Sequence, residues 1–329
     1  MLNRRAWLRT AAGSGAALAL SPTLAKALES LHAGLGVQGS ILKKAIPATG
    51  ELLPVIGLGS SATFATVARS EEVSALKEVF QAMADRGATL FDTAPSYGAS
   101  EQVAGQIVNE LGIAGKMFWA TKLNAAGRGG GTTDPAAARA QVEQSFERLK
   151  RPRIDLIQVH NMSDVPTQLG VLKDYKKEGR VRYIGVTTTF EPQYPGLVEV
   201  MKNEPLDFIG IDYAADNRQV EEAILPLAQE RKIAVLAYAP FGRTSLFRRI
   251  GDRPLPDWAR EVDATTWAQL LLKWVVSHPA ITAVTPATSQ AKHMLDNIGG
   301  GVGRLPTPAQ RQRLIEFVDA LPPAPPRGR

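Results

Sequence analysis

The sequence predicts a (β/α)8 barrel, in which eight parallel strands form a closed ring inside a layer of helices. The chain has 329 residues, of which 44% are hydrophobic, so it can bury one large core. Strand-length apolar runs alternate with helical patterns along the chain, as is typical of βαβ units. Eight such units in about 280 residues match the usual size of this barrel.

Eight apolar runs have the length expected of strands. They cover residues 54–57, 89–92, 117–122, 154–160, 182–187, 207–212, 233–238 and 281–285. A doubly wound sheet is the alternative fold. It is disfavoured because Gly57 and Gly59 form a lone G-x-G, and no early strand leads into a complete G-x-G-x-x-G turn.

The segments between these runs carry helix signals. In one of them a helical spacing ends at Gly87, a residue type that commonly terminates helices. The apolar face of that segment consists of Val73, Leu76, Phe80 and Met83. In another segment Asp134 precedes Pro135, which predicts an N-cap followed by a first-turn proline.

Residues 1–27 have the pattern of a twin-arginine signal peptide. Arg4 and Arg5 precede an apolar stretch over residues 11–20, and Ala25-Lys26-Ala27 supplies an A-x-A cleavage site. A stretch of about ten residues is too short for a stable membrane anchor, which needs roughly twenty. We therefore expect export to the periplasm by the twin-arginine machinery. The alternative is a frayed basic N-terminus of a cytoplasmic protein.

The remaining domain boundaries follow from composition. We expect a polar linker over 28–46, the barrel over 47–320 and a disordered, Pro-rich tail over 321–329. The Gly-rich run at 127–131 is interpreted as a mobile loop. No oligomeric state follows from the sequence.

The charge balance and the missing cysteines exclude several classes of function. The net charge is +6, but residues 1–27 contain four basic residues and no acid, which leaves 34 basic and 32 acidic residues beyond them. A nearly neutral body argues against a nucleic-acid-binding surface. The absence of cysteine excludes disulfides, thiolate metal sites and a cysteine nucleophile. Four scattered histidines do not form a zinc cluster.

Four polar residues follow consecutive predicted strands, at the end of the barrel where active sites of this fold lie. Asp92 ends the second strand and Tyr97 follows five residues later. Lys122 ends the third strand and His160 ends the fourth. Each residue alone has an ordinary structural explanation, such as a helix cap or a rim side chain. Their joint placement favours a catalytic site.

These four residue types together can reduce a carbonyl. As hydride reaches the carbon, the oxygen becomes an alkoxide that needs a proton donor, and Tyr97 can be that donor. A lysine ammonium within a few ångströms of a tyrosine favours the phenolate and lowers the pKa of the phenol, and we assign this role to Lys122. Asp92 can provide the counter-charge for Lys122, and a neutral His160 can donate a hydrogen bond to the substrate oxygen.

The sequence resembles the aldo/keto reductase family from about Pro47 to Asn297. The matching segments are VIGLG, FDTAPSYG with SE after it, ATK, SFERLKRPRIDLIQVH, KKEGRVRYIGV, LAYAPFG and PATSQAKHMLDN. The resemblance implies that Asp92, Tyr97, Lys122 and His160 are the catalytic tetrad of the family. It also implies a barrel fold and a nicotinamide nucleotide as cofactor.

The cofactor residues implied by the resemblance depart from the family pattern. Thr187 and Thr188 stand where the family has Ser-Asn for the nicotinamide carboxamide, and Gly210 stands where it has Gln. Tyr238 matches the aromatic residue on which the nicotinamide stacks, and Gly242 opens the loop that crosses the pyrophosphate. The implied cofactor-binding residues are Thr187, Thr188, Tyr238, Gly242, Arg243, Thr288, Lys292, His293 and Asn297.

The preference between NADP and NAD depends on the last unit. Ala287 and His293 align with the lysine and arginine that often surround the 2′-phosphate of NADP, while Lys292 and Arg243 keep positive charge near that position. We expect NADP, with NAD as the alternative. Lys292 and His293 are also consistent with an ordinary solvated helix start.

The leading hypothesis for function is an NADP(H)-dependent reductase of aldehydes or ketones. An alternative from another class is an exported barrel that binds a nucleotide or sugar without turnover, as a sensor or accessory subunit. An isomerase or lyase is a more distant alternative. The sequence does not name the carbonyl substrate, since specificity loops vary freely in such barrels. The candidate specificity loops follow Asn124, follow Asn161 and run from Leu246 to Trp258.

Overall fold

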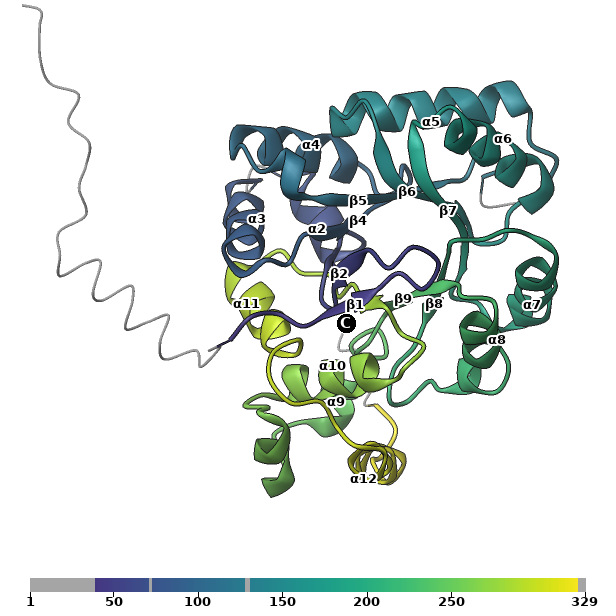
Figure 1. Ribbon diagram of the computed structural model, residues 1–329. Coiled ribbons are helices and arrows are strands. Elements are labelled where there is room, and N and C mark those ends of the chain that lie inside the picture. The colour runs from purple at the N-terminus through teal and green to yellow at the C-terminus, as the bar shows by residue number, and fades with distance from the viewer. Residues whose placement is uncertain (1–38, 71–72, 128–130, 325–329) are drawn as a thin grey trace, which may run out of the picture. The chain divides into compact units, whose positions relative to one another are not determined.

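The computed structural model of the chain describes residues 39–70, 73–127 and 131–324. Helices surround a central ring of strands in this part of the chain (Figure 1). The predicted signal peptide, residues 28–38 of the predicted linker, residues 128–130 of the Gly-rich run and residues 325–329 of the predicted tail lie outside the described residues.

The ring is one sheet of eight parallel strands in the order β10-β9-β8-β7-β6-β5-β4-β3. Bridges Ile56 to Val284 and Gly59 to Ala287 join the first segment to the last and close the ring. The predicted (β/α)8 barrel is therefore confirmed. The strands are β3 (Leu58–Gly59), β4 (Leu90–Asp92), β5 (Phe118–Leu123), β6 (Ile154–His160), β7 (Val181–Thr188), β8 (Phe208–Asp212), β9 (Ala234–Tyr238) and β10 (Ala283–Val284).

Helices follow the barrel strands and cover the outside of the ring. They are α2 (Thr63–Val67), α3 (Ser74–Arg86), α4 (Ser100–Glu110), α5 (Pro135–Leu149), α6 (Val165–Lys177), α7 (Tyr194–Asn203), α8 (Ile224–Glu230), α9 (Ser245–Ile250), α10 (Trp267–Ser277), α11 (Ala291–Gly299) and α12 (Pro308–Asp319). Short 3-10 helices are η2 (Ala114–Lys116), η3 (Glu191–Gln193), η4 (Gln219–Glu221) and η5 (Asp257–Val262). None of the helices in the described ranges is long and apolar enough to cross a membrane.

Two of the predicted helix boundaries can be traced to single residues. Asp134 accepts a hydrogen bond from the backbone N–H of Ala136 (2.9 Å) and caps α5, with Pro135 in the first turn. Helix α3 ends at Gly87, whose φ of 73° lies in the left-handed region that glycine adopts without strain. Both sequence signals are confirmed.

A two-stranded hairpin plugs the N-terminal end of the barrel, and the sequence analysis missed it. Strands β1 (Lys43–Ala45) and β2 (Leu52–Pro54) pair antiparallel, so residues assigned to the linker are part of the fold. Ile46 and Leu53 of the hairpin pack with the first inward-facing residues of the barrel strands, such as Leu90 and Phe118. The apolar run of residues 52–59 is continuous, so apolarity alone did not reveal the bend that separates β2 from β3.

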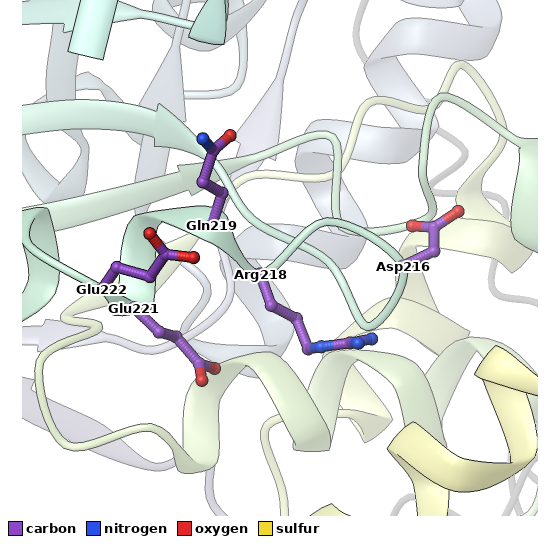
Figure 2. Close-up of a pocket in the computed structure, with 5 residues that line it drawn as sticks. All are labelled: Asp216, Arg218, Gln219, Glu221 and Glu222. Atoms are coloured by element: carbon purple, nitrogen blue, oxygen red, sulfur yellow. The ribbon is translucent and has the colours of Figure 1, made fainter. Parts of the chain in front are cut away.

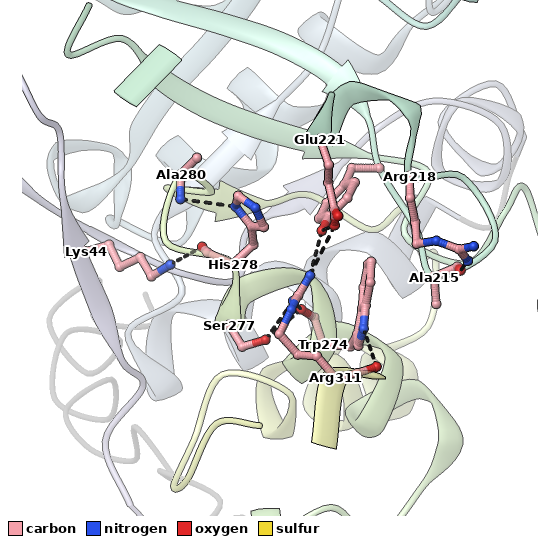
Figure 3. Close-up of polar contacts among 10 residues, drawn as sticks. Lys44, Ala215, Arg218, Glu221, Trp274, Ser277, His278, Ala280 and Arg311 are labelled. Carbon is pink, nitrogen blue, oxygen red and sulfur yellow. Dashed lines mark hydrogen bonds and ion pairs between the residues drawn. The ribbon is translucent and has the colours of Figure 1, made fainter. Parts of the chain in front are cut away.

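The hairpin is held to the barrel by half-buried polar contacts of Lys44. The Lys44 ammonium donates to the carbonyls of Val276 (2.7 Å), His278 (2.9 Å) and Ile281 (2.8 Å), at the C-terminal end of α10. Figure 3 shows the contact between Lys44 and His278, and it also shows Arg311, which reaches from α12 toward Ser277 (2.8 Å) and Glu221 (3.2 Å). Cations at a helix C-terminus are favourable, so Lys44 fastens the hairpin to the end of α10, opposite the strand ends that carry the predicted site.

Candidate active site

The structure places three of the four predicted catalytic residues on adjacent strands. Asp92 is the last residue of β4, Lys122 lies near the end of β5 and His160 is the last residue of β6. Because β4, β5 and β6 are neighbours in a parallel sheet, their C-terminal ends lie side by side. Tyr97 lies on the loop between β4 and α4, where a turn closes with a hydrogen bond from its N–H to the carbonyl of Ala94 (3.0 Å).

Asp92 and Lys122 form a buried ion pair. The Lys122 ammonium lies 2.6 Å from Oδ2 of Asp92 and also donates to the carbonyl of Thr93 (2.8 Å). The side chains are 2% and 5% exposed, so water screens this pair little. Burial alone would lower the pKa of Lys122, but Asp92 and the nearby Tyr97 and Glu101 raise it above its ordinary value. The lysine therefore stays protonated at working pH.

Tyr97 and His160 face the charged end of Lys122. The Lys122 nitrogen lies 5.3 Å from the centre of the Tyr97 ring, and the rings of Tyr97 and His160 meet edge to face with centroids 5.9 Å apart. Burial, assisted by the charge of Lys122, lowers the pKa of His160 to about 3. The imidazole is thus neutral near pH 7, the state expected of a donor to a substrate oxygen.

Glu101 is a further buried carboxylate close to Lys122, and sequence reasoning gave it no role. This carboxylate in the first turn of α4 is 1% exposed, accepts a hydrogen bond from the hydroxyl of Thr121 (2.7 Å) and lies 3.4 Å from Arg148. Thr121 precedes Lys122 on β5, so Glu101 adds negative charge near the ammonium. The Ser-Glu pair after the PSYG segment was its only signal in the sequence.

Tyr238 is also part of this cluster. It is the last residue of β9, and its side chain turns into the barrel, where the hydroxyl accepts a hydrogen bond from Gln158 Nε2 (2.9 Å) and donates to Asp92 Oδ1 (3.2 Å). Its ring centre lies 5.2 Å from the Lys122 nitrogen. The resemblance pointed to the ring of Tyr238, but no sequence pattern pointed to these contacts of its hydroxyl.

The two threonines at the end of β7 differ in their surroundings. Thr187 is the register partner of His160, so the two residues lie at the same level of the sheet. The Thr188 hydroxyl donates to Gln193 Oε1 (2.5 Å) and accepts from the N–H of Phe190 (3.1 Å). Thr188 therefore uses its hydroxyl to hold the loop after β7.

The loop of residues 239–245 has an unusual backbone, and it is called the cofactor loop below because the resemblance implies that it crosses the pyrophosphate. Ala239, Arg243 and Thr244 have φ values of 49°, 51° and 73°, in the left-handed region, and Gly242 has 55°. Non-glycine residues in this region are uncommon and concentrate at functional loops. Arg243 is exposed on this loop.

Asp216, on the loop after β8, holds the cofactor loop in place. It accepts a hydrogen bond from the Ser245 hydroxyl (2.9 Å) and lies 3.7 Å from Arg249. A Cβ atom at Gly242 would meet the Asp216 carboxylate at 2.5 Å, so only glycine fits there. Asp216 also lines a mostly acidic surface cavity of about 470 Å³, together with Arg218, Gln219, Glu221 and Glu222 (Figure 2).

The last group of implied cofactor residues gathers at α11. The Thr288 hydroxyl accepts from the N–H of Gln290 (3.1 Å) just before the helix begins. Lys292 and His293 are exposed in the first turn, while Asn297 is buried. A helix N-terminus with adjacent cations is a favourable place for a phosphate.

The three candidate specificity loops all leave the C-terminal side of the barrel. Asn124 follows β5, Asn161 follows β6, and residues 246–258 include most of α9 after β9. Asn161, Met162 and Asp164 have positive φ values of 58°, 56° and 36°, so the loop after His160 is tightly bent. In the described ranges, no group of three or more His, Asp and Glu side chains could hold a metal ion.

Comparison with known proteins places the chain in a family. Residues 55–308 match the model of the aldo/keto reductase family. Aldo-keto reductase YhdN of Bacillus subtilis (strain 168) is 32% identical over 196 residues, which are 57% of this chain and 58% of that protein, so the chain aligns with under two thirds of its length. Probable aldo-keto reductase 1 of Glycine max is 28% identical over 287 residues, 76% of this chain and 79% of that protein.

Solved structures agree with this assignment at the level of the fold. The crystal structure of an aldo-keto reductase from Klebsiella pneumoniae in complex with NADPH superposes with a TM-score of 0.69, covering 88% of this chain and 98% of that one at 22% identity. At that identity the likeness establishes the barrel, and the family model covers most of the chain. The chain therefore belongs to the aldo/keto reductase family.

Proposed function

We propose that this protein reduces aldehydes or ketones to alcohols with NADPH. The observation that carries the proposal is the buried Lys122 ammonium, which is fixed by Asp92 and faces the ring of Tyr97 beside a neutral His160. A proton donor, a fixed positive charge and a second donor are the groups that a developing alkoxide requires.

Each residue of the tetrad has a separate task in this proposal. A bound nicotinamide supplies the hydride. Tyr97 transfers its hydroxyl proton to the substrate oxygen, and Lys122 stabilises the phenolate that remains. Asp92 holds Lys122 in place by the 2.6 Å ion pair. The neutral His160 donates an N–H to the same oxygen and fixes its orientation.

The chain offers a fitting set of groups for a nicotinamide nucleotide. Buried polar atoms without a hydrogen-bond partner among the described residues include Gln158 Oε1, His160 Nδ1 and Thr285 Oγ1, all on strands or strand ends of the barrel. Thr187 and Tyr238 would hold the nicotinamide end, and the cofactor loop with the first turn of α11 would hold the phosphates. Exposed Lys292 and His293 support NADP over NAD, as does the NADPH complex of the Klebsiella pneumoniae relative.

A turnover assay tests the proposal. The purified protein is mixed with NADPH and a panel of aldehydes and ketones, and oxidation of NADPH is followed by its absorbance. Carbonyl-dependent oxidation is expected, with a higher kcat/KM for NADPH than for NADH. Tight nucleotide binding without turnover of any carbonyl would favour the alternative of an exported nucleotide-binding barrel. A higher kcat/KM for NADH would overturn the NADP preference.

We also propose that residues 1–27 direct export through the twin-arginine pathway. The support is the order of Arg4, Arg5, the apolar stretch and the A-x-A site in the sequence. The double variant Arg4→Lys/Arg5→Lys keeps the charge and should leave the precursor in the cytoplasm, because a receptor reads the arginine pair. Recovery of this variant from the periplasm at the wild-type level would refute the assignment.

A further inference from the structure

The hydroxyl of Tyr238 completes the hydrogen bonding of the catalytic aspartate. Asp92 Oδ2 is bound to Lys122, and Asp92 Oδ1 accepts the Tyr238 hydroxyl (3.2 Å). A phenol has one proton to donate, so its bond to Gln158 must be an accepted one, and the amide N–H of Gln158 supplies it at 2.9 Å. Gln158 is fully buried and lies in register with Lys122 on the adjacent strand. A chain of directed bonds thus runs from Gln158 through Tyr238 to Asp92.

Gly210 creates the space in which the Tyr238 ring lies. A Cβ atom at position 210 would lie 2.5 Å from Cε2, 2.6 Å from the hydroxyl oxygen and 2.8 Å from Cζ of Tyr238. Separations this short are forbidden by van der Waals repulsion, so a side chain at 210 excludes this ring position. The glycine that replaces the customary glutamine of the family therefore has a definite structural consequence.

Lys122 lies close to two tyrosine rings. Its nitrogen is 5.3 Å from the centre of the Tyr97 ring and 5.2 Å from that of the Tyr238 ring. Both rings attract the ammonium, and Asp92 fixes it by the ion pair. A shift of Asp92 or of the Tyr238 ring would consequently change where the positive charge lies relative to the Tyr97 hydroxyl.

We propose that Tyr238 is a positioning residue of the catalytic tetrad and that Gly210 is the residue that admits it. The Tyr238 hydroxyl holds Asp92, and Asp92 holds Lys122 beside the proton donor. The inference rests on the proposed reductase function, and it assigns to Tyr238 a task distinct from stacking against a nicotinamide. It also explains why the chain has glycine at position 210.

The variant Tyr238→Phe separates the hydroxyl from the ring. It keeps the aromatic face but leaves Asp92 Oδ1 and the Gln158 amide buried without their partner, which destabilises the ionised carboxylate. We expect kcat to fall about tenfold, while KM for NADPH and for the carbonyl changes by less than about threefold. A loss confined to kcat indicates a group that acts in the transition state.

The pH profile of kcat distinguishes a positioning role of Tyr238 from a purely structural one, because a structural role would leave the profile unchanged. The titratable groups facing Asp92 or its partner Lys122 are Tyr238 from β9, Tyr97 from the loop after β4, His160 from β6 and Glu101 from α4. Burial raises the pKa of Asp92 above its ordinary value, and Lys122 and the Tyr238 hydrogen bond oppose that rise, so loss of the Tyr238 bond makes Asp92 protonate at still higher pH. The acid limb of kcat in Tyr238→Phe should therefore move to higher pH.

A second variant, Gly210→Ala, disrupts the same hydrogen bond between Tyr238 and Asp92 without changing either residue. In Gly210→Ala the new methyl group forces the Tyr238 ring away from Gln158 and Asp92, so kcat should fall to a similar extent. The losses should not multiply in the double variant Gly210→Ala/Tyr238→Phe, because each change removes the same bond. Tyr175→Phe is the matched control, since it removes a hydroxyl that binds Glu143 between α5 and α6, outside the site.

The experiment uses the full chain and measures kcat, both KM values, the pH profile and urea unfolding without nucleotide. Tyr238→Phe with wild-type kcat and an unmoved acid limb overturns the inference, and so does a loss of stability with an unchanged pH profile. A wild-type protein that reduces no carbonyl refutes the proposed function instead. In that event, urea unfolding at several pH values tests the inference about Tyr238. The destabilisation by Tyr238→Phe should be largest at the pH values where Asp92 is ionised and should shrink as Asp92 protonates. A pH-independent difference contradicts the bond to Asp92.

Discussion

The two halves of the barrel mouth differ in how directly the sequence places their side chains. On β4, β5 and β6, Asp92, Lys122 and His160 stand at strand ends and meet because their strands are neighbours. In the half formed by β7, β8 and β9, the Thr188 hydroxyl donates a hydrogen bond to Gln193. The Tyr238 hydroxyl donates one to Asp92, which lies 146 positions earlier in the sequence. Strand order therefore brings Asp92, Lys122 and His160 together. In the other half, the positions of the side chains depend on hydrogen bonds to residues outside their own strands.

The largest effect is expected from variants of Tyr97 and Lys122, in the half of the mouth formed by β4, β5 and β6. Tyr97→Phe removes only the hydroxyl, so the protein should fold normally while kcat/KM for carbonyl reduction falls by about 10²–10⁴. Lys122→Met should have a similar effect, because it removes the charge that stabilises the phenolate, and it also leaves Asp92 buried without its ion pair. Steady-state kinetics with circular dichroism as the folding check measure both. Tyr97→Phe activity within threefold of wild type would contradict the tetrad assignment.

The next effect concerns the cofactor loop in the second half. Gly242→Ala places a Cβ 2.5 Å from the Asp216 carboxylate at a φ of 55°, so the loop must leave its present conformation. We expect KM for NADPH to rise about tenfold, with a smaller change in kcat. This would show that the second half binds the nucleotide and the first half performs the chemistry.

Gly87→Ala provides the control for backbone strain. Gly87 follows α3 with a φ of 73° and a ψ of 18°, in the left-handed region, and the nearest atom to an added Cβ is Ile41 Cγ2 at 3.7 Å. This variant should lose about 1 kcal/mol of stability, as left-handed alanines do, with an unchanged KM for NADPH. An equal rise of KM in both variants would mean that strain, and not the contact with Asp216, controls binding.

The same contrast explains what could be predicted from the sequence. The barrel, the cap at Asp134 and the proximity of Asp92, Lys122 and His160 follow from local patterns, because strand ends and helix caps are marked by neighbouring residues. The β1–β2 hairpin was missed because its apolar residues merge with those of the first barrel strand. The Tyr238 hydroxyl contacts and the Asp216 contact to Ser245 join separate strand units, and no spacing along one chain reports them.

The loss of stability on acidification can be compared between the mouth of the barrel and its opposite end. Burial lowers the pKa of His160 in the mouth to about 3 and that of His278 near Lys44 to about 4. Both histidines take up protons more readily when unfolded, so stability is full above about pH 6.5 and falls as the pH drops toward the folded-state values.

Urea unfolding at pH 7, 6 and 5 measures this loss. His160→Gln should reduce the loss between pH 6.5 and pH 5 by on the order of 1–2 kcal/mol, because glutamine does not titrate. The comparison with His278→Gln shows how much each end contributes. An unchanged pH dependence in His160→Gln would mean that His160 is not the buried neutral group inferred here.

The smallest expected effect tests how the second half selects its nucleotide. Lys292 is exposed in the first turn of α11, where its charge adds to that of the helix N-terminus. Lys292→Ala should raise KM for NADPH about twofold to fivefold and leave KM for NADH unchanged, because only NADPH carries the additional phosphate. Since exposed charges are screened, the difference should shrink at high salt.

Lys202→Ala on α7, whose side chain is 53% exposed, is the control for a general change in surface charge. An equal rise for both nucleotides would place Lys292 at the shared pyrophosphate, and the preference for NADPH would then depend on other residues.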